Sequence, residues 1–145
     1  MAGTTGTQET MDAQARVHEY FRAWTSGNIP GALALMTDDV TVNAPNGEYH
    51  GEAGYRDFLE GFLRLLDAVE ESTILVDGDT AIIWYRYRTR IPGLAPQLAA
   101  ERITLRQGRI AIIDYLFDQV PFAQAFGSAT GADLHEAVNR GQARG

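Results

Sequence analysis

The spacing of the apolar residues changes part-way along the chain, and this change limits the folds that the chain can adopt. Up to about residue 66, apolar side chains recur every three or four positions, as they do on one face of an α-helix. From about Ser72 onward they alternate with polar residues, as they do along a half-buried β-strand. Helices followed by strands predict an α+β domain, in which the helices pack on one face of an antiparallel sheet.

Three helices are predicted in the first half of the chain. The first runs from Asp12 to Ser26, and the second, much shorter, begins after Asn28 and runs to Met36. The third carries the most regular apolar stripe in the sequence, which consists of Tyr55, Phe58, Leu59, Phe62, Leu63 and Leu66. Such a stripe needs an apolar surface to cover, and we expect the sheet to provide it.

Five strands are predicted, and turn sequences separate them. The strands comprise residues 40–43, 73–76, 80–91, 98–106 and 109–117. The turns are marked by Gly and Pro, most clearly at Asp77-Gly78, at Pro92 to Pro96 and at Gln107-Gly108. A sheet that curls around the helix stripe leaves a concave cavity, so functional side chains are expected on its inner face.

The length of 145 residues corresponds to one domain, with a core large enough to enclose one pocket. Apolar residues make up 45% of the chain and charged residues 21%, as in an ordinary globular protein. We expect residues 1–11 to form a disordered tail and residues 12–127 to form the domain. Residues 128–145 are expected to be a flexible tail with one short helix near residues 134–138.

Charge and composition exclude several classes of protein. The net charge of −7, without a basic stripe, argues against binding to nucleic acids or to membrane surfaces. The absence of Cys excludes disulfides, thiolate zinc sites and cysteine nucleophiles. Neither a signal peptide nor a membrane-spanning segment is recognisable, so a cytoplasmic protein is expected.

The histidines do not form a metal-binding or catalytic pattern. His18 lies on the polar face of the first predicted helix, His50 in a loop and His135 in the C-terminal tail, so each is expected to be solvated. No His-x-x-x-His motif and no glycine-rich phosphate loop occurs. Neither a metal ion nor a cofactor is therefore expected.

The hairpin formed by residues 80–91 and 98–106 determines which side chains face the cavity. A symmetric loop places Arg88 opposite Glu101, so that Trp84 and Arg86 share the inner face with Glu101. A carboxyl group among apolar neighbours would have a shifted pKa and could act as an acid or a base. The alternative is that Arg88 and Glu101 form an ordinary ion pair at a solvated sheet edge.

The next hairpin determines whether Asp114 or Tyr115 joins Glu101. A two-residue turn at Gln107-Gly108 would place Asp114 beside Glu101, whereas a three-residue loop would place Tyr115 there. Gln adopts a positive φ less readily than Asn or Asp. The three-residue loop is therefore favoured, with Tyr115 directed inward.

Several short segments, in this order and spacing, together resemble one superfamily. They are residues 20–24 (YFRAW), 27–28 (GN), 34–42 (ALMTDDVTV), 51–52 (GE) and 114–118 (DYLFD). From about Ala13 to Gly127 the chain resembles the NTF2-like superfamily, and within it the SnoaL-like polyketide cyclases, the ketosteroid isomerases and the limonene-epoxide-hydrolase-like proteins. The resemblance implies a cone of three helices on a curved antiparallel sheet, which commonly forms a homodimer through the outer sheet face.

The resemblance also implies roles for individual residues. Tyr20 falls where the isomerases hold their oxyanion-hole tyrosine, and Glu101 falls near their protonated oxyanion-hole aspartate. The isomerase general base falls on Ala44, which cannot accept a proton, and the neighbouring Asn43 can only form hydrogen bonds. Steroid-type isomerisation is therefore not expected.

The resemblance to the epoxide hydrolases is incomplete. It includes Arg86, but an aspartate of their pattern is replaced by Arg88, and a second one falls on Tyr115, or on Asp114 if the strand is shifted by one residue. Epoxide hydrolysis or epoxide-opening cyclisation therefore requires Asp114 to point inward beside Glu101.

The leading hypothesis is a cofactor-independent cyclase or isomerase that closes a ring in a polyketide-like intermediate of secondary metabolism. The bulky apolar substrate would contact an aromatic lining formed by Tyr20, Trp24, Phe62, Trp84 and Tyr115. Ring closure by conjugate addition and by cycloaddition both remain open. The alternatives are epoxide chemistry and a non-catalytic dimeric ligand-binding domain, in which Trp24 would simply be a core residue.

Overall fold

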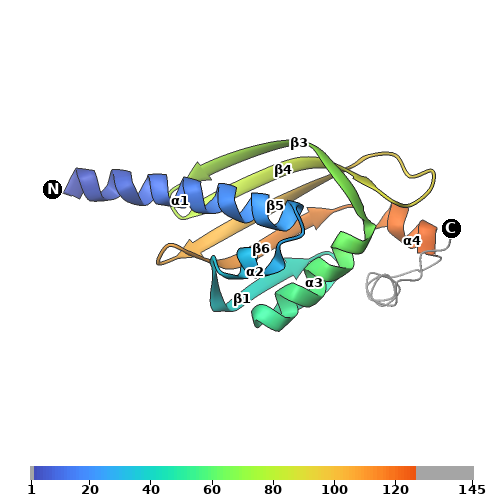
Figure 1. The fold of residues 1–145 in the computed structure, drawn as a ribbon, viewed down its shortest axis with the longest axis horizontal. Coiled ribbons are helices and arrows are strands. Elements are labelled where there is room, and N and C mark those ends of the chain that lie inside the picture. Colours follow the sequence, from blue (N-terminus) through green and yellow to red (C-terminus); the bar gives the residue numbers. More distant parts are fainter. Residues whose placement is uncertain (1, 127–145) are drawn as a thin grey trace.

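The computed structural model describes residues 2–126, which form four helices and six strands (Figure 1). In chain order these elements are α1 (Ala2–Thr25), α2 (Ile29–Leu33), β1 (Met36–Ala44), β2 (Gly47–His50), α3 (Gly51–Leu65), β3 (Leu66–Asp77), β4 (Thr80–Thr89), β5 (Gln97–Arg106), β6 (Arg109–Phe117) and α4 (Val120–Phe126). The prediction of an α+β domain is confirmed.

The strands form one curved sheet of order β2-β1-β6-β5-β4-β3, and α1 and α3 lie across one face of it (Figure 1). All neighbouring strands are antiparallel except β1 and β6, which are parallel. The sheet is therefore mixed, and the prediction of a purely antiparallel sheet was wrong. Because β1 and β6 are far apart in the sequence, no turn signal links them, and their pairing is decided by packing.

The helices differ from their predicted bounds at several ends. Helix α1 begins at Ala2, ten residues before the start predicted at Asp12. Extension of a helix that has already formed costs much less than its nucleation, so weak helix formers can prolong a stable helix. Helix α2 ends earlier than predicted because Met36 already belongs to β1. The predicted C-terminal tail over residues 128–145 lies outside the described residues.

The sequence patterns did not predict two of the elements and predicted only part of a third. Strand β2 and helix α4 were not predicted, and β3 begins at Leu66, directly after α3, rather than at residue 73. The first half of β3 lacks apolar alternation because it is an exposed edge strand. Its hydrogen-bonding partner β4, rather than its own sequence pattern, determines its conformation.

The register of the β4–β5 hairpin differs from the symmetric one and reverses the orientation of every β4 side chain. Glu101 lies opposite Ile83, not opposite Arg88. The chain after Thr89 does not extend the ladder, because the Arg90 N–H donates to the Leu65 carbonyl (2.8 Å) at the end of α3 and Ile91 is buried there. A shift by an odd number of residues exchanges the two faces of a strand.

The β5–β6 hairpin brings Tyr115 opposite Glu101, but not through the predicted three-residue loop. The turn has two residues, Gln107 and Gly108, both with positive φ (52° and 77°). An irregularity follows in β6, since Leu105 pairs with Ile110 but Thr104 pairs with Ile112, leaving Ala111 as an extra residue. This bulge restores the register that the short turn alone would have shifted by one residue.

Candidate functional site

A cluster of three polar side chains lies inside the cone, and we call Glu101, Tyr20 and Tyr115 the polar cluster. The Tyr20 hydroxyl of α1 donates to Oε1 of Glu101 on β5 at 2.5 Å. The hydroxyls of Tyr20 and Tyr115, which is on β6, are 3.0 Å apart. Glu101 and Tyr20 are completely buried, and Tyr115 is almost so. Three elements that are distant in sequence therefore place a carboxyl group at one end of a chain of two hydroxyls.

Burial determines the electrostatics of this cluster. It raises the pKa of Glu101 to about 7, although the hydrogen bonds from Tyr20 and Tyr115 and the nearby Trp24 indole act in the opposite direction. Burial, and to a smaller extent the negative charge of Glu101, raise the pKa of Tyr20 and that of Tyr115 well above the ordinary value. The tyrosines therefore stay protonated near neutral pH, and Glu101 is the group that changes its charge.

Three buried polar atoms in and beside the cluster have no hydrogen-bond partner. Oε2 of Glu101, Nε1 of Trp24 and the Tyr55 hydroxyl are all buried and unpaired. The Trp24 indole acts on the pKa of Glu101 from nearby but does not reach hydrogen-bonding geometry. Unpaired buried polar atoms are costly and are concentrated at functional sites, which supports a role for this cluster beyond packing.

An aromatic cavity adjoins the polar cluster at Tyr115. Its lining consists of Phe58, Phe62, Tyr85, Tyr87, Ala99, Tyr115 and Phe117. The rings pack closely, with centroids of Phe58 and Tyr115 at 4.6 Å and those of Phe62 and Tyr87 at 5.2 Å. The free volume is only about 10 Å³, room for a single water molecule. A larger ligand therefore enters only if the partly exposed rings of Phe62 and Phe117 turn aside.

Comparison with known proteins identifies the family of this cone. A sequence model of the SnoaL-like domain matches residues 17–113. The chain belongs to the SnoaL-like family. This family is part of the NTF2-like superfamily and includes cyclases and isomerases. None of the curated proteins matches the chain.

Solved structures share the SnoaL-like fold over most of the chain. A protein from Kribbella flavida DSM 17836 is 30% identical over 76% of this chain and 89% of its own, with a TM-score of 0.70. A candidate polyketide cyclase from Xanthomonas campestris pv. campestris is 18% identical over 78% of this chain and 95% of its own, with a TM-score of 0.66. TerC, co-crystallised with polyporic acid, is 20% identical over 78% of this chain and 96% of its own, with a TM-score of 0.67.

Three predicted inner residues on β4 of this SnoaL-like domain lie on the outer face instead. Trp84 and Arg86 are half-buried there, and Arg88 is exposed. Arg88 bonds to Asp67 (2.7 Å) and Glu70 (3.1 Å), not to Glu101. The prediction that these side chains line the pocket was wrong because the β4–β5 register is shifted by an odd number of residues.

Asp114 and Asn43 also lie outside the cone. Asp114 is held by Arg102, whose Nη2 donates at 2.8 Å, and by the Asn43 amide at 2.9 Å. The paired carboxylates that epoxide chemistry requires are thus not assembled, because the bulge at Ala111 turns Tyr115 rather than Asp114 inward. Asn43 consequently bonds to Asp114 on the outer face and does not reach the cavity.

The remaining predicted residues lie inside, and four more aromatic residues join them. Phe62 lines the cavity, and Trp24 packs between Phe21, Phe62 and Tyr85 without exposure. Sequence reasoning missed the lining residues Phe58, Tyr85, Tyr87 and Phe117. Tyr85 and Tyr87 are two residues apart and therefore share one face of β4. Only the register of β4 shows that this face, and not the one that carries Trp84, is the inner one.

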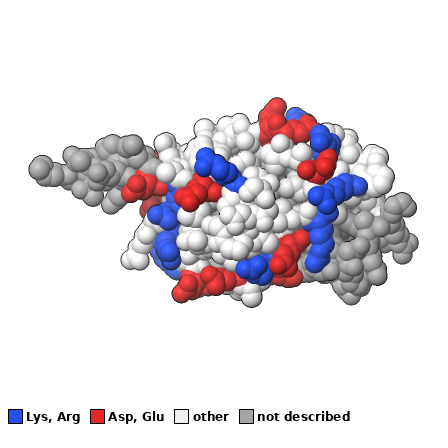
Figure 2. Space-filling model, viewed as in Figure 1, with Lys and Arg blue, Asp and Glu red and all other residues white. Residues whose placement is uncertain are grey.

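Three further observations concern metal ligands, membrane helices and surface charge. Among the side chains described, those of residues 12–125, no three His, Asp or Glu residues gather as potential metal ligands. No helix of this part of the chain is long and apolar enough to cross a membrane. On the face seen in Figure 2, acidic and basic side chains lie in mixed groups around the rim, and no continuous basic stripe is visible there.

Proposed function

We propose that this protein is a cofactor-independent cyclase or isomerase of secondary metabolism, which acts in the cytoplasm on a neutral, polyketide-like carbonyl compound. The observation that carries this proposal is the polar cluster, a buried carboxyl group connected through two hydroxyls to an aromatic cavity. The cavity lining has no charged side chain, and its aromatic rings suit an apolar substrate.

The polar cluster would act as a reversible proton relay. The proton of neutral Glu101 passes to the Tyr20 oxygen, the Tyr20 proton passes to the Tyr115 oxygen, and Tyr115 gives its own proton to the substrate carbonyl oxygen. When Glu101 is protonated, its hydroxyl donates to Tyr20, the reverse of the hydrogen bond that Tyr20 donates to the carboxylate. After the transfer Glu101 is a carboxylate, and the substrate carbonyl is protonated and therefore activated towards a nucleophile. Because the pKa of Glu101 is raised to about 7 by burial, both of its protonation states are accessible at neutral pH.

Ring closure by conjugate addition would use this relay in both directions. Protonation of an enone oxygen draws electron density from the β-carbon, to which a nucleophile of the same molecule adds. The enol then returns its oxygen-bound proton through Tyr115 and Tyr20 to Glu101, and its α-carbon takes up the proton that the nucleophile released. No atom is gained or lost overall. Once the lining rings have moved to admit the substrate, the aromatic cavity would hold the flexible chain in a reactive conformation.

The proposal is tested with Tyr20→Phe and Glu101→Gln in the source organism. Both variants are expected to lower the cyclised product by about tenfold or more, towards the level of a deletion strain, because each interrupts the relay. Extracts are compared by mass spectrometry, with correctly folded protein verified by circular dichroism. Asp114→Asn is the matched comparison, since Asp114 lies on the outer face, and we expect it to retain the wild-type product level.

A non-catalytic dimeric ligand-binding domain is the second candidate, and it is favoured by the lining of the cavity, which would suit an apolar ligand without any chemical step. Unchanged product levels in both Tyr20→Phe and Glu101→Gln would establish this second candidate and exclude the first. Both candidates include a homodimer formed through the outer face of the sheet.

The proposed dimer rests on an exposed apolar patch on that outer face. It includes Leu75, Ile82, Leu98, Ile112 and Leu116, of which Leu116 is 70% exposed. We expect Leu116→Lys to convert the dimer into a monomer, as measured by light scattering after size-exclusion chromatography. Val120→Lys is the control, because Val120 is 59% exposed but lies on α4. A wild-type monomer, or a dimer that survives Leu116→Lys, would contradict the proposed interface.

A further inference from the structure

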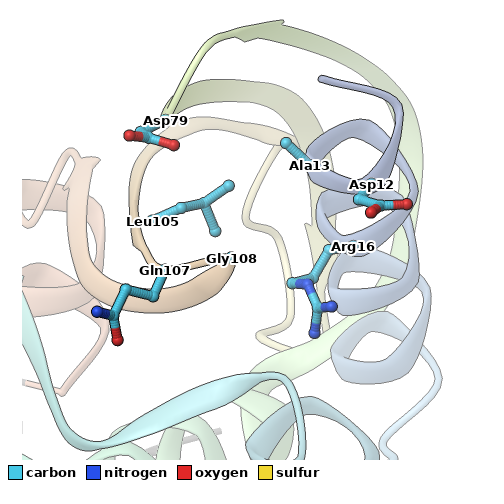
Figure 3. Close-up of a pocket in the computed structure, with 7 residues that line it drawn as sticks. All are labelled: Asp12, Ala13, Arg16, Asp79, Leu105, Gln107 and Gly108. Carbon is cyan, nitrogen blue, oxygen red and sulfur yellow. The ribbon is translucent and has the colours of Figure 1, made fainter. Parts of the chain in front are cut away.

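A second pocket lies between α1 and the tips of two hairpins (Figure 3). It lies at the opposite ends of β4, β5 and β6 from the aromatic cavity and shares no lining residue with it. Its volume is about 520 Å³, which is within the usual range for small-molecule sites. The lining includes Ala13 and Arg16 of α1, Asp79 of the β3–β4 turn, Leu105 of β5, and Gln107 and Gly108 of the β5–β6 turn. We call it the hairpin pocket.

The floor of the hairpin pocket is apolar and firmly held. Ala13 and Leu105 are both buried, with exposures of 7% and 4%. The Leu105 N–H donates to the Asp79 carbonyl at 2.8 Å and thereby joins the tips of the two hairpins. The pocket therefore offers a preformed hydrocarbon surface, which reduces the entropic cost of binding a ligand.

Arg16 is a cation without a partner at one end of this pocket. Its Nε is buried and has no hydrogen bond, and no ion pair joins it to any residue in the described part of the chain. Asp12, one helical turn away, also lines the pocket, but it forms no ion pair with Arg16, and its carboxylate points away from the pocket centre in Figure 3. Three arginines of the sheet, Arg88, Arg102 and Arg106, all have carboxylate partners. A partly desolvated guanidinium is stabilised by an anion, and a carboxylate fits its geometry.

Asp79 supplies the opposite charge at the other side. Figure 3 shows Asp79 and Arg16 on opposite sides of the pocket, with Leu105 between them. The Asp79 side chain has no hydrogen bond or ion pair with residues 12–125, the part of the chain whose side chains are described. Asp79 and Arg16, separated by an apolar floor, therefore complement a ligand that has a cationic group at one end and an anionic group at the other.

We propose that the hairpin pocket binds a small zwitterion whose carboxylate and ammonium groups are separated by an apolar spacer. The carboxylate pairs with the Arg16 guanidinium. The ammonium group pairs with Asp79, and the spacer covers Leu105. This ligand differs from the neutral substrate of the aromatic cavity, so the hairpin pocket is a separate site with its own ligand.

The test uses three probes with the same hydrocarbon chain: ε-aminocaproate, caproate and hexylamine. The first carries both charges, and each of the others carries one. Binding is followed through the backbone amide signals of Ala13, Leu105 and Gly108 in nuclear magnetic resonance titrations of the full chain. We expect saturable shifts with ε-aminocaproate, and affinities lower by about tenfold or more for the two singly charged probes.

Substitutions then assign each charge to its partner. Arg16→Gln should reduce the affinity for ε-aminocaproate by about tenfold or more, and so should Asp79→Asn. The controls are Arg22→Gln on the same helix and Asp77→Asn in the same hairpin, both exposed residues outside the lining, which should leave the affinity unchanged. Absence of saturable binding, equal affinities for the three probes, or unchanged affinity in Arg16→Gln would each overturn the proposal.

Discussion

Glu101→Gln is expected to make the protein more stable at pH 8 and to remove a pH dependence of about 3 kcal/mol from its free energy of unfolding. Burial raises the pKa of Glu101 to about 7 in the folded state, from the value of 4.5 that an exposed Glu has. Between these two values the folded protein binds the proton and the unfolded chain does not. The stabilisation from this proton is complete below about pH 4.5 and is lost as the pH rises to about 7.

The measurement is urea denaturation of wild type and Glu101→Gln at several pH values between 4.5 and 8. The difference between the two proteins isolates Glu101, because the other acidic groups contribute equally to both. Glu71→Gln is the control: Glu71 is exposed on β3, so this variant should keep the wild-type pH dependence. A pH dependence that is the same in wild type and in Glu101→Gln would refute a raised pKa for this buried carboxyl group.

Trp24→Ala is expected to lower the free energy of unfolding by about 3 to 5 kcal/mol, the usual cost of removing a large aromatic side chain from a core. Trp24 is completely buried, and its ring lies 5.4 Å from those of Phe21 and Tyr85 and 5.7 Å from that of Phe62, between centroids. Its removal leaves a large cavity beside Glu101. Urea denaturation gives the change in stability.

Trp84→Ala is the matched control, because Trp84 is the other tryptophan of the chain and is only half-buried on the outer face. We expect it to cost about 1 to 2 kcal/mol, less than Trp24→Ala, since part of the Trp84 ring remains in contact with water on the outer face. Both variants are compared at a protein concentration at which they have the same oligomeric state. An equal or larger loss in Trp84→Ala would contradict the register that places Trp84 outside.

The sequence predicts best those structural features that depend on residues close together in the chain. The helix stripe that includes Tyr55, Phe58 and Phe62 depends on neighbouring residues, and α3 forms where that stripe predicts a helix. The strand at Gln97–Arg106 likewise follows from its own alternation, and Glu101 lies inside it as expected. Edge strand β3 begins earlier than its pattern indicates because its partner strand, not its sequence, fixes its conformation.

The side chains that surround Glu101 depend on the register between neighbouring strands, which the sequence did not determine. Tyr115 lies inward as expected, but the reason is the bulge at Ala111 and not a longer loop, since Gln107 does adopt a positive φ. Trp84, Arg86 and Arg88 lie outward because the loop after Thr89 docks on the end of α3. Neither the bulge nor the docking has a local sequence signal.

The sequence by itself determined the α+β class, the positions of the turns and the resemblance to the SnoaL-like family. It also determined that Tyr20 and Glu101 could supply a hydrogen-bond donor and a buried acid. Only the tertiary structure decided which side chains accompany them, and only it brought Arg16 and Asp79 to one pocket. The physical reason is the two-residue period of a strand: a shift by one residue costs little locally but exchanges the core and solvent faces, so packing across the whole sheet selects the register.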